Sequence, residues 1–154
     1  MGDWEGDLLV GPQSRSAIAT LVDRRSRLVK LVHLPDGHAA DELRDALTDS
    51  LTDMRVQARR TLTWDQGSEM ACHHELAPLF SEGVYVAFAG QPWQRGSNEN
   101  TNGLLRQYFP KGTDLSRHSP NDLTATEERL NHRPRKTLHW QTPIQDFTAA
   151  LPSE

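Results

Sequence analysis

Hydrophobic positions in the N-terminal part of the chain gather into three segments typical of β-strands. Residues 4–10, 17–22 and 28–34 are apolar, β-branched or alternating, and a half-buried strand repeats its buried positions every second residue. Residues 11–12 (Gly-Pro) and the polar run 24–27 separate them, and both have turn-forming compositions. The pattern predicts three strands joined by tight connections.

A helical period replaces this alternation after residues 36–37. Leu43, Leu47, Leu51 and Met54 recur at intervals of four, four and three, which is the spacing that lines one side of a helix. The sequence therefore predicts an amphipathic helix after the third strand.

The rest of the chain alternates short apolar strands with helices. In chain order the pattern predicts a strand over 60–64 that stops at Asp65, a short helix from Ser68 to about Phe80, a strand over 84–89, a helix from Ser97 that ends before Pro110, and a helix from about Pro120 to Asn131. Strand–helix–strand units imply parallel pairing through right-handed crossovers, whereas the three opening strands pair as hairpins. This order is found in ribonuclease H-like folds. We expect one α/β domain over residues 1–154, with a mixed five-stranded sheet flanked by helices.

Composition sets broad limits on the class of protein. The 36% hydrophobic and 25% charged residues are typical of a soluble globular domain. The chain has no apolar run of the roughly 18 residues that span a bilayer and no signal-peptide pattern at its start, so we expect a cytoplasmic protein with no membrane partner. Cys72 is the single cysteine, which excludes an internal disulfide and a cysteine-rich zinc site.

Charge is distributed unevenly along the chain. The net charge is −4, but residues 1–93 hold 9 Lys and Arg against 14 Asp and Glu, whereas residues 94–154 hold 8 against 7. The basic residues of the second part are Arg95, Arg106, Lys111, Arg117, Arg129, Arg133, Arg135 and Lys136, and they alternate with Trp93, Tyr108, Phe109 and Trp140. Cations interleaved with aromatic rings favour a nucleic-acid surface. An ordinary solvated charged face is the alternative.

Three carboxylates fall at positions where an open α/β sheet carries its chemistry. Asp7 lies in the first strand, Asp65 at the end of the fourth, and Glu99 in the first turn of the helix after the fifth, and functional groups gather at such strand ends. Clustered carboxylates repel one another unless a cation neutralises them, and oxygen ligands select Mg²⁺ or Mn²⁺. Two such ions could clamp both oxygens of an in-line phosphoryl transfer. Glu5, on the same strand face as Asp7, and Glu69, one helical turn past Asp65, stay open as alternatives.

Four motifs identify the family that this chain resembles. They are residues 4–8 (WEGDL), 62–65 (LTWD), 92–113 (PWQRGSNENTNGLLRQYFPKGT), and 131–138 (NHRPRKTL) followed by Thr142-Pro143. Together they closely resemble the DDE transposases of bacterial insertion-sequence family thirty, whose catalytic cores have a retroviral integrase-like fold. The resemblance covers nearly the whole chain.

The resemblance implies a function and a site. In the family two aspartates and a glutamate hold the catalytic metals, with 33 residues between the second and third, as between Asp65 and Glu99 here. It therefore implies Asp7, Asp65 and Glu99 as catalytic and metal-binding residues, with Mg²⁺ or Mn²⁺, two ions, as cofactor. The implied reaction is cleavage and strand transfer of DNA, at transposon ends and target, by a homo-oligomer. Residues implied or predicted to contact DNA are Trp93, Arg95, Arg106, Lys111, Arg133, Arg135 and Lys136.

Departures from the family pattern leave other functions open. Residues 86–91 lack the Asp-Pro-x-Ser expected before Pro92-Trp93. The family also has an N-terminal helix-turn-helix region for end recognition, and this chain begins about where the first catalytic strand begins, so we expect a core without it. Alternatives are a ribonuclease H-like nuclease and a non-catalytic fragment that regulates full-length transposase.

The sequence leaves the role of three asparagines open and argues against a metal site at a second group of residues. Asn98, Asn100 and Asn102 could hydrogen-bond the Glu99 carboxylate, the DNA backbone or helix-end amides. Cys72 with His73-His74 is not expected to bind metal, because adjacent helical residues point in different directions.

Overall fold

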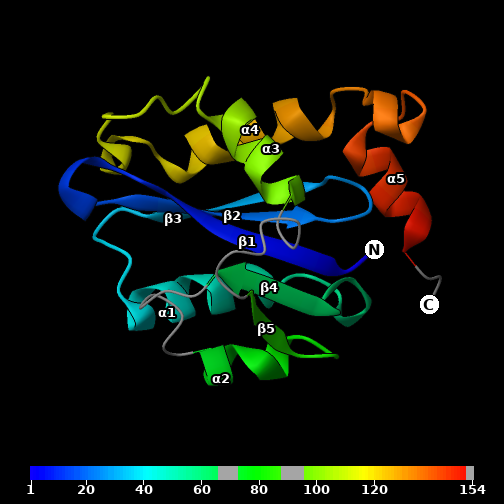
Figure 1. Ribbon diagram of the computed structural model, residues 1–154, viewed down its shortest axis with the longest axis horizontal. Helices are drawn as coiled ribbons and strands as arrows, with labels where there is room; N and C mark the ends of the chain where they lie inside the picture. The colour runs from blue at the N-terminus through cyan, green and yellow to red at the C-terminus, as the bar shows by residue number, and fades with distance from the viewer. Residues whose placement is uncertain (66–72, 88–95, 152–154) are drawn as a thin grey trace.

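A five-stranded sheet forms the centre of the molecule (Figure 1). The computed structural model describes residues 1–65, 73–87 and 96–151; the side chains of residues 65, 73, 87 and 96–100 are outside that description. The strands are β1 (Asp3–Val10), β2 (Ala17–Asp23), β3 (Val29–Leu34), β4 (Thr61–Asp65) and β5 (Val84–Ala87), in the spatial order β3-β2-β1-β4-β5.

The pairing confirms the predicted mixed sheet. β1, β2 and β3 pair antiparallel in sequence, whereas β4 pairs parallel with both β1 and β5. A parallel neighbour needs a crossover connection, and helix α1 (Ala40–Leu51) supplies it between β3 and β4. Leu43, Leu47 and Leu51 are its buried residues, three of the four that the sequence period predicts.

Helices cover both faces of the sheet (Figure 1). On one face the leucines of α1 join a core with Trp4, Leu62 and Trp64. On the other face lie α3 (Gly96–Leu105), against β1 and β2, and α4 (Pro120–Asn131), against β3. Side chains alternate along β1, so Trp4 belongs to the α1 face and Leu9 to the α3–α4 face. Glu5 and Asp7 therefore share the α3–α4 face.

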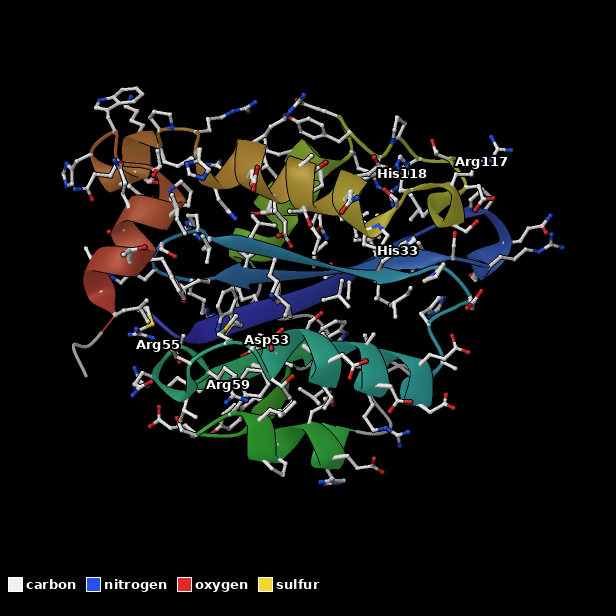
Figure 2. All side chains as sticks on the ribbon, turned by 180° about the vertical axis from the view of Figure 1, so that it is seen from behind. His33, Asp53, Arg55, Arg59, Arg117 and His118 are labelled. Carbon is white, nitrogen blue, oxygen red and sulfur yellow. The ribbon has the colours of Figure 1, made fainter. Side chains whose placement is uncertain are left out.

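Two histidines hold the segment between α3 and α4, His33 by a contact from the sheet edge and His118 by a contact within the segment. His33 Nε2, on β3, lies 2.9 Å from the carbonyl oxygen of Leu115, and the His118 ring meets Phe109 edge-on with 4.8 Å between centroids (Figure 2). The connection is therefore held over the same face that carries Asp7.

Other predicted elements match with shifted ends. Helix α2 (His73–Leu76) continues as a 3-10 turn over Ala77–Leu79, so the described part of the predicted helix 68–80 is shorter and irregular. β5 ends at Ala87, and the predicted residues 88 and 89 lie outside the described residues. α5 (Pro143–Ala150) was not predicted; Thr142 and Gln145 form a capping box at its start. Within the described residues, no helix is both long and apolar enough to cross a membrane.

α4 closes the exposed edge of the sheet with side-chain hydrogen bonds. Asn131 Oδ1 accepts from the Val29 amide at 2.8 Å and its Nδ2 donates to the Val29 carbonyl at 2.9 Å. One turn earlier, Glu127 Oε1 accepts from the Leu31 amide. These bonds satisfy backbone groups of β3, an edge strand that would otherwise offer them to another chain. Asn131, part of the 131–138 motif, thus has a structural role.

Replacing Glu127 by glutamine should stabilise the fold at neutral pH. Burial is the main cause that raises the pKa of Glu127 above its usual 4.5, against the hydrogen bond from Leu31 and the charge of Lys30. A carboxyl with a raised pKa in the folded state binds protons more tightly there than when unfolded, so its contribution to stability is present at low pH and is lost as pH rises through the folded pKa. Glutamine keeps the acceptor oxygen without the charge.

Thermal unfolding of the two proteins across pH measures this. The glutamine variant should melt higher at pH 7, and the difference should vanish below the ordinary pKa. Glu128→Gln, at an exposed neighbour, should show little of this pH dependence. A melting difference that grows toward acid pH would contradict the interpretation.

Candidate active site

Asp7 is held in one orientation by hydrogen bonds from two elements. Its side chain is half-buried on the α3–α4 face of β1. Oδ1 accepts from the Leu8 amide at 2.8 Å, and Oδ2 accepts from Asn102 Nδ2, on α3, at 3.1 Å. The Asn102 bond joins residues 95 apart in sequence, so α3 positions this carboxylate directly.

Thr20 completes this arrangement from β2. It is the register partner of Asp7 and is fully buried. Its Oγ1 lies 3.1 Å from Asn102 Oδ1 and 3.3 Å from the Asp7 carbonyl oxygen, and a hydroxyl donates one hydrogen to one or the other. Thr20 and Asn102 together tie β1, β2 and α3 at the predicted carboxylate.

The other two predicted acids belong to elements that contact β1. β1 and β4 pair with Trp4 opposite Leu62 and Gly6 opposite Trp64; Asp7 and Asp65, the last residue of β4, are the next residues of the two strands. Glu99 lies in α3 three residues before Asn102, and residues three apart are neighbours on one side of a helix. The side chains of Asp65 and Glu99 lie outside the described residues, so the triad stays a prediction.

The alternative acids have other surroundings. Glu5 is buried at 1% exposure and its Oε1 lies 3.1 Å from Arg24 Nε. Asp3 accepts from Thr61 Oγ1 at 2.7 Å and lies 3.5 Å from Arg60 Nη1. Each therefore has a local polar or cationic neighbour away from α3, whereas Asp7 faces α3. Glu69 lies outside the described residues.

The search for metal-binding groups covers only the side chains that the structure describes. Among these side chains, no three histidine, cysteine, aspartate or glutamate residues gather as a metal-binding set. Cys72 and the His73 side chain are outside that search, as are the side chains of Asp65 and Glu99.

The predicted DNA-contacting residues fall into three groups. Trp93 and Arg95 lie outside the described residues. Arg106 directly follows α3 and donates from Nη1 to the Phe109 carbonyl at 3.3 Å, and Lys111 is exposed beyond it. Arg133, Arg135 and Lys136 lie in the connection between α4 and α5, on the α4 side of the sheet (Figure 1). Their contacts with DNA stay predictions.

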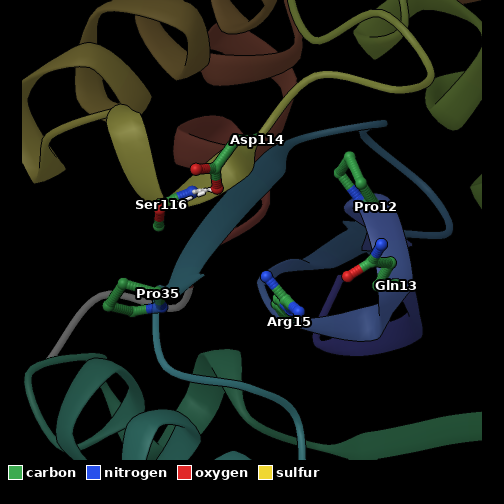
Figure 3. Close-up of a pocket in the computed structure, with 6 residues that line it drawn as sticks. All are labelled: Pro12, Gln13, Arg15, Pro35, Asp114 and Ser116. Carbon is green, nitrogen blue, oxygen red and sulfur yellow. Dashed lines mark hydrogen bonds between the residues drawn. The ribbon is translucent and has the colours of Figure 1, made fainter.

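A cavity of about 320 Å³ lies away from this carboxylate, at the turn between β1 and β2 (Figure 3). Its lining residues are Pro12, Gln13, Arg15, Pro35, Asp114 and Ser116. Hydrogen bonds from the hydroxyl and amide of Ser116 are the main causes that lower the pKa of Asp114. Asp114 therefore fastens a loop as a stable carboxylate and is poorly suited to donate a proton.

Replacing Asn102 by alanine should lower the metal-dependent activity that we propose below by about 10- to 100-fold, the usual effect of removing a group that orients a metal ligand. The variant loses the bonds to both Asp7 and Thr20. A positioning role predicts that the metal concentration needed for half-maximal activity rises, which a loss of stability would not produce. Gln107→Ala, at an exposed position five residues on, is the control. Unchanged metal dependence in the Asn102 variant would contradict this role.

Comparison with solved structures defines the class of fold. The chain superimposes on the catalytic core domain of BIV integrase with a TM-score of 0.68 at 16% identity, covering 97% of this chain and 95% of that one. It also matches a chain of the simian T-cell lymphotropic virus intasome with a TM-score of 0.72 at 22% identity, covering 98% and 56%. The fold is that of retroviral integrase cores, which are ribonuclease H-like, and the predicted fold class is confirmed.

Sequence comparison then identifies the family. Residues 1–92 match the integrase core domain, and the chain belongs to that family. It is 52% identical over 150 residues to the transposase for insertion sequence element IS1086 of Cupriavidus metallidurans, covering 97% of this chain and 44% of that protein. It is 47% identical over 143 residues to the InsI transposase of IS30A of Escherichia coli, covering 93% and 37%. The chain therefore spans less than half the length of these relatives, and its resemblance to insertion-sequence family thirty is confirmed.

Proposed function

We propose that this chain is the catalytic core of a DDE transposase, in which Asp7, Asp65 and Glu99 bind divalent cations for DNA strand cleavage and strand transfer. The bond from Asn102 Nδ2 to Asp7 Oδ2 carries the proposal, because it anchors α3, and with it position 99, at the strand that bears Asp7. The parallel pairing of β1 with β4, which ends in Asp65, supports the same grouping.

The surroundings of Asp7 suit a hard cation. Its carboxylate oxygens accept hydrogen bonds from the Leu8 amide and from the Asn102 side-chain amide. Carboxylate oxygens are the ligands that Mg²⁺ and Mn²⁺ prefer. Asp7, Asp65 and Glu99 would hold the ions, with two ions as the expected number.

In this proposal the side chains of the protein would orient the metal ligands and the DNA, and the cations would activate the reacting oxygens. Divalent cations bound here would activate the attacking hydroxyl and stabilise the leaving oxygen of in-line phosphoryl transfer. Asn102 and Thr20 would fix the Asp7 carboxylate, so that little reorganisation is needed when DNA binds. Arg106, Lys111 and the residues Arg133, Arg135 and Lys136 would hold phosphates.

We further propose DNA, as transposon ends and target, and a second copy of the chain as partners. The two relatives compared above are transposases, and one structural neighbour comes from an intasome. Action on DNA would place the protein at the nucleoid in the cytoplasm, and residues 1–154 would form one catalytic domain.

Nicking and joining assays test the proposal. Wild-type protein is incubated with Mn²⁺ or Mg²⁺, supercoiled plasmid and labelled transposon-end DNA, beside Asp65→Asn and Glu99→Gln. We expect nicking and joined products from the wild type and none from either variant. Identical behaviour of wild type and variants would contradict the proposal and favour a non-catalytic fragment. Cleavage of an RNA–DNA hybrid without strand joining would favour a ribonuclease H-like nuclease.

A further inference from the structure

The connection between α4 and α5 is a closed and anchored loop. The Arg135 amide donates to the Gln141 carbonyl at 2.9 Å, and the Trp140 amide donates back to the Arg135 carbonyl at 2.8 Å. Asn131 binds β3 at one end of the loop, and the Thr142 capping box starts α5 at the other. The side chains between these anchors are therefore presented on a fixed backbone.

Trp140 projects from this loop into solvent. Its side chain is 67% exposed, the largest exposed fraction among the large hydrophobic residues described. His139 and Trp140 both have positive φ, 54° and 68°, in the left-handed region that non-glycine residues seldom adopt. The fold thus strains its backbone here and obtains no burial of the tryptophan ring. Residues with such strain cluster at active sites, ligand clamps and switch regions.

Three arginines gather beside this loop without a described carboxylate. Arg27 comes from the β2–β3 turn, and Arg133 and Arg135 come from the loop. Burial, followed by the charges of Arg133 and Arg27, lowers the pKa of Arg135, so both of these cations lie near Arg135. Within the described residues, Arg27 Nη1 and Arg135 Nε are buried without a hydrogen-bond acceptor. The nearby acid Asp146 lies 3.6 Å from Arg25 instead.

This surface is separate from the predicted triad. The β2–β3 turn lies beside the start of β1, since the Arg24 amide donates to the Asp3 carbonyl at 2.9 Å, whereas Asp7 faces α3 further along that strand. In Figure 1 the loop lies at the same end of the sheet as this turn. A ligand bound here would contact the protein at a second place.

The combination of groups fits one chemistry. Arg133 Nη2 lies 3.5 Å from the Tyr108 hydroxyl. Clustered guanidinium groups bind anionic oxygens, and phosphate matches their geometry. An exposed tryptophan ring stacks on a base that is not already stacked in a duplex. An acidic peptide could bind the arginines through its carboxylates, but its acidic side chains would not stack on the Trp140 ring.

We propose that Trp140, Arg27, Arg133 and Arg135 form a binding site for an unpaired stretch of a DNA strand. The tryptophan stacks on one base, and the arginines hold the neighbouring phosphates. The choice of DNA as the ligand rests on the proposed function.

Binding measurements in EDTA, where no cleavage occurs, test the site. Fluorescence anisotropy compares an oligothymidylate of about twenty nucleotides, which exceeds common single-strand site sizes, with a duplex of equal length. Trp140→Ala and Trp140→Gly should each weaken single-strand binding by roughly tenfold or more and duplex binding by less than twofold. Glycine accepts positive φ without strain, so its effect would not reflect misfolding. Tyr85→Ala, at another exposed aromatic residue, should leave both affinities unchanged.

Charge-neutralising variants test the arginines. Arg133→Gln and Arg135→Gln should weaken binding to both probes and each lower the salt dependence by about one counterion. Arg44→Gln removes the same charge from α1, on the other face of the sheet, and should change neither.

The outcomes separate this inference from the proposed function. Unchanged single-strand binding by the Trp140 variants, with nicking that still requires Asp65, would overturn the inference and leave the function standing. If Trp140 substitution abolishes single-strand binding but the wild-type protein never nicks DNA, the inference stands and the proposed function is overturned. Polyglutamate that competes equally with wild type and Trp140→Ala would also overturn it, in favour of an acidic protein partner.

Discussion

Asp7→Asn should abolish metal-dependent strand cleavage, whereas Glu5→Gln should leave it within a few fold of wild type. The two residues lie on one face of β1, but Asp7 faces Asn102 of α3 and Glu5 faces Arg24 of the β2–β3 turn. Metal ligation is worth several kcal/mol of transition-state stabilisation, and each 1.4 kcal/mol is tenfold in rate. Loss of a ligand at Asp7 should therefore lower the cleavage rate by roughly a thousandfold or more.

In thermal stability the order of the two variants should be reversed, with the larger effect from Glu5→Gln. Glu5 is buried and its Arg24 neighbour is about half exposed, so glutamine can keep the hydrogen bond but loses the charge interaction. We expect Glu5→Gln to lower the melting temperature and Asp7→Asn to change it little. Plasmid nicking and thermal unfolding on the same preparations measure both effects. Full activity in Asp7→Asn, with loss in a folded Glu5→Gln, would move the proposed site to Glu5.

Alternation and helical period were sufficient for most of the fold. The three opening strands, α1 and α4 lie within a residue or a few residues of their predicted bounds, because each buries one regular face. α5 lacks such a face: Pro143 and Phe147 are its buried residues, and the Phe147 ring packs at 5.8 Å from Trp4. Two buried positions give too weak a period to predict a helix, so its capping box was the better signal.

The site required information that periodicity does not contain. Strand period puts Glu5 and Asp7 on one face and so cannot choose between them, and the family motif made that choice. The structure adds a physical difference between the two acids. Glu5 has Arg24 as its neighbour, and Asp7 has Asn102, which is 95 residues away in the sequence. The sequence left three possible roles for Asn102, and its bond to Asp7 was not among them.

Edge and loop residues show a similar limit. Asn131 and Arg135 belong to one sequence motif, yet Asn131 binds β3 while Arg135 joins Arg27 from a turn about a hundred residues earlier. Composition predicted a basic surface in the C-terminal part of the chain. It did not predict that Arg27 lies near Arg135, because this depends on the β2–β3 turn packing beside the connection between α4 and α5.

Gly6→Ala should destabilise the fold by about 3 kcal/mol, at the upper end of the usual range for overpacking, and lower the melting temperature by about 6–12 °C. A Cβ at Gly6 would lie 2.1 Å from Cε3 and 2.2 Å from Cζ3 of Trp64. Trp64 is fully buried on the α1 face and is the register partner of Gly6 on β4. Because the Trp64 ring is fully buried, we expect β1 and β4, which carry Asp7 and Asp65, to move apart.

Gly103→Ala is the matched control for this prediction. A Cβ at Gly103 meets nothing within 4 Å, and alanine within a helix is favoured over glycine by about 0.5–1 kcal/mol, so this variant should melt slightly higher. Thermal unfolding of both variants, with nicking measured well below their melting temperatures, separates the effects. Gly6→Ala should lose activity even where it is folded, since the two strands that bear the aspartates are displaced. A Gly6→Ala protein with wild-type stability would contradict this prediction. It would show that the Trp64 ring can shift without moving β1 and β4 apart.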